Sequence, residues 1–344
     1  MSEPALSYTL IIVIMGKGGY TVEFRWPCER VVLNCLTCKA GVDFSHSSGT
    51  CTGCGQHYRV LDGAPVMLEE SGHRAEQPIL SEAESQRQAV REMFTTINHS
   101  LEEQGVSRFS TFINFGYEPL EEEESSADRH QGVNESSVRM LQEVVKGFEL
   151  DGRDILEVGC GRGGNVNYIC RSSKPNLAVG LDLTEANISF CQNNNRYEQL
   201  YFCVGDAEQL PFERESFDVI LNVESSHLYP DVYAFYREVY RVLKPGGAFL
   251  YADALDVPVF KACMEQLEGM GFEVVLKRDI TENVLRSCKT SLKNRYAALS
   301  RGFQEEEDKI MNWLAAPGTA KYQDMFTGKR TFHIVQLVKR GNSV

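Results

Sequence analysis

Residues 156–164 read LEVGCGRGG, and this stretch decides the fold that the sequence predicts. An apolar strand pattern runs directly into a loop that holds Gly159, Gly161, Gly163 and Gly164, and a helical pattern follows. Glycine permits the tight turn from a strand into a helix, and it lets a ligand approach the backbone closely. A tight turn without any ligand would share this pattern, so the surrounding segments must decide between the two.

Those segments alternate between apolar strands and amphipathic helices up to about residue 256. Strand patterns occur at LAVGLD (177–182), LYFCVGD (200–206), FDVILNV (217–223) and AFLYAD (248–253). Strands that are separated by helices pair in parallel and form a three-layer α/β sandwich. The sequence therefore predicts a three-layer α/β fold with a parallel sheet, whose ligands bind beyond the carboxyl ends of the strands.

Acidic residues stand at those carboxyl ends. Asp182 can accept both hydroxyls of a ribose, whereas Asp206 can accept from an adenine amino group while the Ala207 N–H faces a ring nitrogen. Glu157 lies inside the first strand, where a buried acid is costly unless it is paired. Together they predict an adenosine site without a pyrophosphate cradle. A nicotinamide-dependent dehydrogenase is the minor alternative, because it would have no use for the acid on the third strand.

The stretches LEVGCGRGG, LDLT, GDAEQLPFERESFDVI and LKPGG, in this order over about residues 136–256, resemble the motifs of class I S-adenosylmethionine-dependent methyltransferases. GLDLTEANISFC and NVESSHLYP resemble, more narrowly, bacterial methyltransferases of polyketide and lipid hydroxyls, such as the phthiotriol dimycocerosate methyltransferases. The resemblance implies an α/β fold with a doubly wound, Rossmann-like sheet of seven strands, helices on both faces and S-adenosylmethionine across the first four strands. The cofactor-binding residues that we expect are Tyr117, Glu157, Gly159, Cys160, Gly161, Asp182, Leu183, Asp206, Ala207, Glu208 and Asn222.

Two of these residues depend on the resemblance alone. Asn222 would place its backbone near the methionine amino group. The segment FSTFINFGYE (109–118) resembles a lid over the cofactor, in which Tyr117 would cover or hydrogen-bond the methionine end. The alternative is that Phe112, Phe115 and Tyr117 are aromatic residues of the core.

Four cysteines near the start of the chain have the spacing of a metal site. Cys35, Cys38, Cys51 and Cys54 form two C-x2-C pairs that are twelve residues apart. Such pairs hold zinc tetrahedrally, and four thiolates leave no open position, so we expect a structural zinc. Paired disulfides are less favoured. Zinc ribbons also precede the methyltransferase domain in ribosomal-RNA guanine methyltransferases, but residues 1–70 hold five Lys or Arg against seven Asp or Glu, so this ribbon is not basic.

Composition limits the partners. The net charge of −13 disfavours binding to nucleic acid. The longest apolar run, LIIVIM (10–15), is too short for a membrane span and lacks the features of a signal peptide, so it predicts a strand. We expect a cytoplasmic protein with reduced cysteines. Association with a biosynthetic assembly is compatible with the sequence, and the oligomeric state is open.

The chain divides into a zinc-ribbon domain (1–70), a linker with a helical lid segment (71–135) and the methyltransferase domain (136–344). The third part includes a lid insert at about 279–316, where apolar residues recur at helical spacing. An apolar lid suits a bulky hydrophobic acceptor.

The segment NVESSHLYP (222–230) follows the fourth strand and should face the reacting methyl group. An alcohol needs a base, and His227 is the best candidate, with Glu224 to orient it or to face the methionine amine. A capping or solvated histidine is the alternative. Asp253 is a second candidate base, and Asp253, Asp256 and Glu224 could converge on a divalent metal. Tyr229 should form pocket wall and Asp231 should cap the next helix.

The sequence thus predicts O-methylation of a hydroxyl on a bulky apolar natural product, a polyketide or a lipid. Three alternatives remain. They are a zinc-ribbon RNA methyltransferase, a carbon or nitrogen methyltransferase of a small molecule, and a scaffold protein that binds no cofactor.

Overall fold

The computed structural model describes residues 24, 26–27, 30–45, 48–68, 80–121, 123, 134–299 and 307–341. The strand predicted at residues 10–15 and most of the acidic run at 121–126 lie outside the described residues.

Seven strands form the predicted doubly wound sheet, in the order β7-β6-β5-β8-β9-β11-β10. Strands β5 to β9 pair in parallel, while β11 runs antiparallel between β9 and β10. The strands are β5 (Asp154–Val158), β6 (Leu177–Asp182), β7 (Leu200–Gly205), β8 (Phe217–Val223), β9 (Leu243–Asp256), β10 (Phe272–Asp279) and β11 (Arg330–Lys339). The order reverses at β5, so the carboxyl ends of β5 to β8 meet where ligands bind in such sheets.

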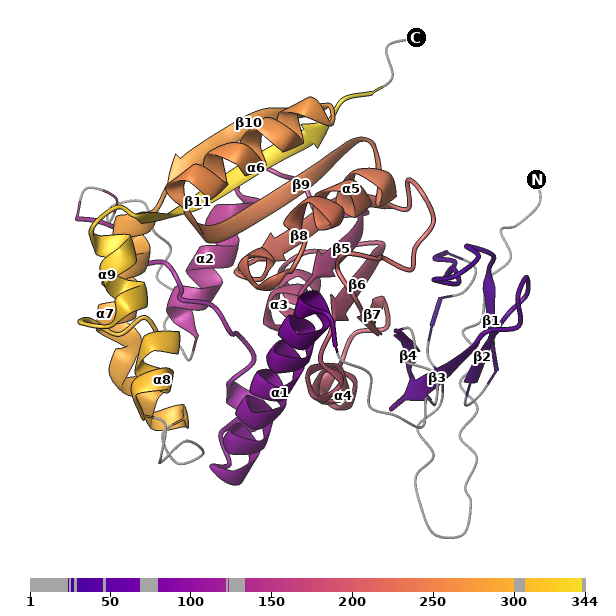
Figure 1. Cartoon of the computed structure of the whole chain (residues 1–344), viewed down its shortest axis with the longest axis horizontal. Coiled ribbons are helices and arrows are strands. Elements are labelled where there is room, and N and C mark those ends of the chain that lie inside the picture. Colours follow the sequence, from indigo (N-terminus) through magenta and orange to yellow (C-terminus); the bar gives the residue numbers. More distant parts are fainter. Residues whose placement is uncertain are drawn as a thin grey trace.

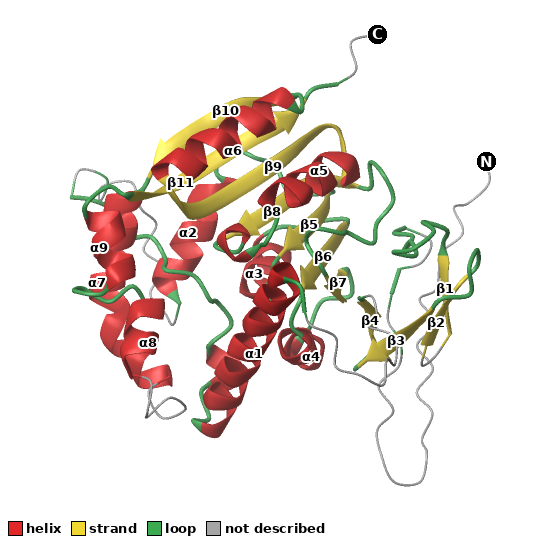
Figure 2. Cartoon of the chain, viewed as in Figure 1, coloured by secondary structure: helices red, strands yellow, loops and turns green. Residues whose placement is uncertain are grey.

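Helices cover both faces of this sheet (Figure 2). Successive residues of β9 point to opposite faces, so Phe249 and Tyr251 pack against the α5 and α6 side whereas Leu250 and Ala252 pack against the α2 side. The helices are α1 (Glu82–Glu103), α2 (Glu135–Val145), α3 (Gly164–Ser172), α4 (Glu185–Asn194), α5 (Val232–Val242), α6 (Val257–Gly269), α7 (Thr281–Leu299), α8 (Glu307–Trp313) and α9 (Ala320–Phe326), with short 3-10 turns η1 (Ser107–Phe109) and η2 (Ser226–Leu228). None of the described helices is long and apolar enough to span a membrane.

The cysteine-rich segment extends the sheet, which the sequence did not predict. Strands β1 (Val42–Ser45), β2 (Ser48–Cys51), β3 (His57–Leu61) and β4 (Ala64–Met67) form an antiparallel meander. Strand β4 then pairs in parallel with β7, so that Val66 lies opposite Val204 and Met67 opposite Gly205. Eleven strands therefore form one continuous series, with the meander at one end (Figure 1).

Candidate active site

The glycine loop after β5 forms the floor of a cleft of about 870 Å³, with its open mouth included. Gly159 has a φ of +72°, and a Cβ atom there would lie 1.8 Å from Ser225 Oγ and 2.8 Å from the Tyr229 hydroxyl. No side chain fits at this position, so the loop needs glycine both for its backbone angle and for its close approach to the end of β8. The cleft brings together these residues predicted from the sequence: Glu157, Gly159, Cys160, Gly161, Asp182, Leu183, Asp206, Ala207, Glu208 and Glu224.

Asp182 holds the glycine loop in place. Its Oδ2 atom accepts a hydrogen bond of 2.8 Å from the Gly161 N–H, and its Oδ1 atom accepts from the Thr184 N–H and from Asn187 Nδ2. Burial raises the pKa of this carboxyl despite these bonds. Each carboxylate oxygen has two lone pairs, so Asp182 can brace the loop and still accept from a ligand.

Helix α1 closes the cleft over the acids that follow β7. Arg87 Nε lies 2.7 Å from Asp206 Oδ2, and the same guanidinium pairs with Glu208. One residue earlier, Gln86 Nε2 donates to the Leu228 carbonyl at 3.1 Å. The helix is therefore tied to the ends of two different strands.

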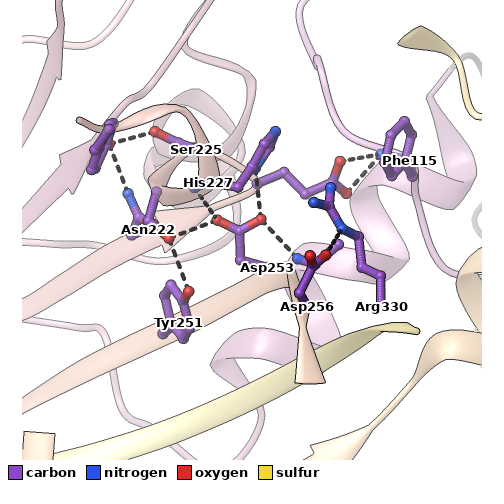
Figure 3. A network of polar contacts seen from close by, with 12 residues as sticks. Phe115, Asn222, Ser225, His227, Tyr251, Asp253, Asp256 and Arg330 are labelled. Atoms are coloured by element: carbon purple, nitrogen blue, oxygen red, sulfur yellow. Dashed lines mark hydrogen bonds and ion pairs between the residues drawn. The ribbon is translucent and has the colours of Figure 1, made fainter. Parts of the chain in front are cut away.

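His227 lies in the turn η2 and is fixed by Asp253 at the end of β9 (Figure 3). Its Nδ1 atom is 2.8 Å from Asp253 Oδ1, and its backbone N–H donates to Asp253 Oδ2 at 3.0 Å. Ser226 Oγ also donates to Oδ2, at 2.7 Å. Burial alone would raise the pKa of Asp253, but the adjacent imidazole and these hydrogen bonds hold it below its ordinary value. The histidine side chain is 19% exposed, whereas the aspartate is fully buried.

Glu224 accepts hydrogen bonds from Phe115 rather than contacting His227, so of its two predicted roles the contact with the methionine amine stays a prediction. Its two oxygens accept from the Phe115 N–H at 2.7 and 2.9 Å, because the left-handed backbone at Glu224, with a φ of +51°, turns its side chain toward that segment. Burial raises its pKa to about 8. A non-glycine residue in this conformation is strained, and such strain is often found at functional sites.

A second cavity, of about 2000 Å³ with its mouth included, adjoins the first. Both cavities are lined by Phe94, Phe112, Ile113, Asn114, Glu224 and Leu228, and His227 lines the second. Helix α1, the turn η1 and helix α8 supply apolar walls, including Ile97, Leu101, Val106, Phe109 and Trp313. The imidazole thus stands beside the junction between the cleft of the glycine loop and a second chamber with aromatic and aliphatic walls.

Comparison with known proteins identifies the family. A family model described as a methyltransferase domain matches residues 156–251. A fatty-acid O-methyltransferase of Mycolicibacterium smegmatis is 33% identical over 236 residues, which are 66% of this chain and 83% of that protein. The chain belongs to the S-adenosylmethionine-dependent methyltransferases. A phthiotriol/phenolphthiotriol dimycocerosates methyltransferase of Mycobacterium tuberculosis is 39% identical over 175 residues, which are 51% of this chain and 65% of that protein.

Solved structures support the fold of this methyltransferase. The [4+2]-cyclase SpnF has a TM-score of 0.61 at 19% identity and covers 78% of this chain and 100% of its own. A geranyl diphosphate C-methyltransferase of Streptomyces coelicolor, solved with S-adenosyl-L-homocysteine, has a TM-score of 0.55 at 14% identity and covers 76% and 100%. At such identities only the architecture is shared. The alternatives of a dehydrogenase and of a scaffold without a cofactor are wrong.

The polar atoms of the cleft fit the cofactor of a methyltransferase. Glu157 Oε1 accepts from Asn165 Nδ2 at 2.7 Å, but Glu157 Oε2 and Asn165 Oδ1 are buried and have no partner among the described residues. Two unpaired buried acceptors beside the cleft suit a ligand that brings hydrogen-bond donors, as the α-ammonium group of S-adenosylmethionine does. The glycine floor and the acids after β6 and β7 leave room and acceptors for its adenosine.

Two residues with predicted cofactor contacts, Tyr117 and Asn222, are not among the residues that line the cleft, so these contacts stay predictions. Tyr117 is 4% exposed in the core, its hydroxyl donates to Glu123 at 2.8 Å, and it lines neither cavity. Residues Thr111 to Asn114 of the same segment line the cleft instead. Asn222 is fully buried and donates through Nδ2 to the Val158 carbonyl at 2.9 Å, which ties β8 to β5 behind the cleft. Val223, Glu224 and Ser225, at and just after the end of β8, line the cleft instead.

The four cysteines come together as predicted. Their sulfur atoms all lie within 4.8 Å of one another, and the Gly53 and Cys54 N–H groups point at the sulfur of Cys51. Zinc–sulfur bonds of about 2.3 Å in a tetrahedron require sulfur atoms about 3.8 Å apart, so little adjustment is needed. Among the described residues this is the only metal-type group, because Asp253 pairs with His227 and Asp256 pairs with Arg330 at 3.0 Å. The predicted alternative of a carboxylate metal site is not formed.

Proposed function

We propose that this methyltransferase transfers the methyl group of S-adenosylmethionine to a hydroxyl oxygen of a bulky, largely apolar molecule, a polyketide or a lipid. The observation that carries the proposal is the His227–Asp253 pair at the junction of the two cavities. When bound, S-adenosylmethionine supplies an electrophilic methyl group on a sulfonium. In this reaction the protein orients the acceptor, excludes water and takes the proton of the hydroxyl.

The contact between His227 and Asp253 allows the imidazole to act as a general base. Because the ionised Asp253 accepts from Nδ1–H, the neutral imidazole has its free lone pair on Nε2. Nε2 can then take the proton of a hydroxyl while its oxygen attacks the methyl carbon, and Asp253 stabilises the imidazolium that results. The imidazolium later releases the proton to solvent.

The second cavity favours an apolar acceptor. Its size and its aromatic and aliphatic walls suit a long or bulky hydrocarbon body. Two relatives support this class, since their names specify fatty acids and phthiotriols as the molecules that they methylate. No described residue of the cysteine-rich segment lines either cavity, so we assign that segment no contact with the acceptor.

A carboxylate is the second candidate acceptor, and Arg295 of α7 favours it. This partly buried guanidinium lines the acceptor cavity, and its hydrogen bond within the described part of the chain goes to the Phe115 carbonyl at 2.5 Å. Burial lowers its pKa, but a guanidinium stays protonated at neutral pH, and its remaining donors suit an anionic acceptor. A carboxylate is already ionised at neutral pH and needs no base.

We further propose that Cys35, Cys38, Cys51 and Cys54 hold a structural zinc ion. Four thiolates leave no open position for chemistry, and the short meander has little core of its own, so metal binding would stabilise its fold.

The test compares His227→Ala with wild type on acceptors of equal chain length that end in a phenol, an alcohol or a carboxylate. Turnover of the hydroxyl acceptors should fall about 10²–10⁴-fold, while the affinity for S-adenosylhomocysteine stays within about twofold. Methylation of a carboxylate should be nearly unaffected, which separates the two candidates. His99→Ala, an exposed histidine on α1, is the matched control. Undiminished hydroxyl turnover in His227→Ala would exclude the base.

A further inference from the structure

The loop that follows β7 has two faces. One face belongs to the cofactor cleft, since Asp206, Ala207 and Glu208 line it at the position predicted for adenine. The other face lies against the cysteine-rich meander. We call residues 205–212 the adenine loop.

Hydrogen bonds join the adenine loop to the backbone on both sides of a single cysteine. The Asn34 N–H donates to the Pro211 carbonyl at 2.8 Å, and Gln209 Nε2 donates to the Leu36 carbonyl at 3.0 Å. Between these two contacts lies Cys35, which is fully buried and belongs to the four-cysteine group. A residue that would bind zinc is therefore flanked on each side by a residue that holds the adenine loop.

Further contacts fix both ends of the loop. At its start, Gly205 pairs with Met67 in the β4–β7 ladder. At its end, Phe212 forms a bridge with Leu33 and stacks on Trp26, with ring centroids 6.3 Å apart. Phe212 is completely buried in the core that Trp26 and Cys35 also join. The adenine loop thus has its packing surface on the meander.

The cysteine site in turn controls the shape of that surface. Tyr58 donates to the sulfur of Cys35 at 3.3 Å, and its oxygen accepts from the Leu36 N–H at 2.9 Å. Without a metal, only weak hydrogen bonds join the cysteine side chains to one another, at 3.6 Å between Cys35 and Cys54 and at 3.3 Å between Cys38 and Cys51. A bound ion would hold Cys35, and through Asn34 and Leu36 it would hold the adenine loop.

We infer that the four-cysteine site is a positioning site for the cofactor: zinc in this site fixes the adenine loop, so that metal occupancy sets the affinity for S-adenosylmethionine. This role rests on the proposed zinc site but not on the proposed acceptor or base. It differs from a role in gripping RNA or closing the acceptor cavity, because the surface involved faces the adenine loop. The matching ligand is the cofactor itself.

The experiment measures zinc content by mass spectrometry and S-adenosylhomocysteine affinity by calorimetry on the full chain. Cys54→Ser, at an exposed ligand, should lose zinc and weaken the affinity at least tenfold. Gln209→Ala should keep its zinc and still weaken the affinity about three- to tenfold, because it cuts one link between Leu36 and the loop. Gln56→Ala, whose side chain bonds only within the meander, is the matched control and should match wild type.

Each readout can overturn a separate step. If purified wild-type protein contains no zinc, the proposed metal site is wrong. If Cys54→Ser folds without zinc and still binds S-adenosylhomocysteine with wild-type affinity, zinc does not control cofactor binding. If Cys54→Ser fails to fold, the Gln209→Ala variant provides the test. If Gln209→Ala and Gln56→Ala bind S-adenosylhomocysteine equally well, the inference is wrong. This outcome does not depend on the turnover of any acceptor.

Discussion

Asp253 decides which nitrogen of His227 faces the acceptor. Its carboxylate accepts from Ser226, from the His227 backbone and from Nδ1, so it needs to be ionised, and its lowered pKa keeps it so. In Asp253→Asn the amide can donate to Nδ1 instead, which would place the proton on Nε2 and remove the base. We expect kcat for hydroxyl acceptors to fall about 10³–10⁴-fold.

The measurement for Asp253→Asn is the pH dependence of kcat, together with cofactor affinity. The matched control is Asp256→Asn, which lies three residues further along β9 and pairs with Arg330. A variant at Asp253 that kept wild-type kcat at every pH would show that the histidine tautomer plays no part.

Glu224 should make folding stability depend on pH. Its pKa is raised from 4.5 to about 8 in the folded protein, so between these values the folded state keeps a proton that the unfolded state releases. The stabilisation is complete below pH 4.5 and is lost as the pH rises toward 8, with a limiting slope of about 1.4 kcal/mol per pH unit. Glu224→Gln cannot ionise, so its Tm relative to wild type should rise between pH 6 and 9.

Thermal melts of ligand-free protein across this range test the prediction for Glu224. Glu265→Gln, an exposed position on α6, is the control and should track wild type. If the Tm values of wild type and Glu224→Gln change with pH in parallel, the pKa of Glu224 is not raised in the folded protein.

Sequence patterns predicted which residues line the cleft better than they predicted which side chains are hydrogen-bonded to each other. Glycines and strand-end acids are placed by the sheet itself, so most of them line the cleft as expected. The partner of His227 is 26 residues away on another strand, and spacing along the chain does not show which strand-end side chain meets the imidazole. An aromatic residue fits a lid and a core equally well, so the pattern does not distinguish the two places for Tyr117, which is buried.

At the scale of elements, helix α1 acts as a latch across the cofactor cleft. Arg87 holds Asp206 and Glu208 at the end of β7, while Gln86 holds Leu228 after β8. Arg87→Ala would release one side of the helix, so S-adenosylhomocysteine should dissociate about three- to tenfold faster, as stopped-flow measurements can show. Arg91→Ala, one turn further along α1 and outside the cleft, should leave the rate unchanged. Equal rates in the two variants would exclude the latch.

Local periodicity predicted the helices well but not where they dock. The segment SVRMLQEVVKGF (137–148) has apolar residues at helical spacing, and α2 occupies Glu135–Val145; α4 (Glu185–Asn194) likewise lies between two strand patterns. Spacing of apolar residues reports which face of a helix is buried. It does not report that α1 and α8 meet over one cavity, since those helices are about 200 residues apart in sequence and their contact depends on tertiary packing.

At the scale of the whole molecule, the meander protects an edge of the sheet. Strand β4 pairs with backbone groups of β7 that would otherwise be unpaired, and Trp26, which precedes the meander, covers Phe212 and Tyr201. The sequence did not reveal this pairing, because β4 has only four residues and its partner follows more than 130 residues later. Exposed strand edges beside apolar surface promote association between chains.

Removal of residues 1–68 should therefore do more than abolish zinc binding. The exposed edge of β7 and the uncovered aromatic residues should lower the Tm and drive concentration-dependent self-association, which sedimentation velocity would detect. Cys54→Ser keeps β4 paired with β7, so it should keep the wild-type association state. Because it loses zinc, it should still weaken cofactor binding. The two variants thus separate the covering role of the meander from its metal-dependent role. A truncated protein with the wild-type sedimentation profile and Tm would show that the edge of β7 needs no cover.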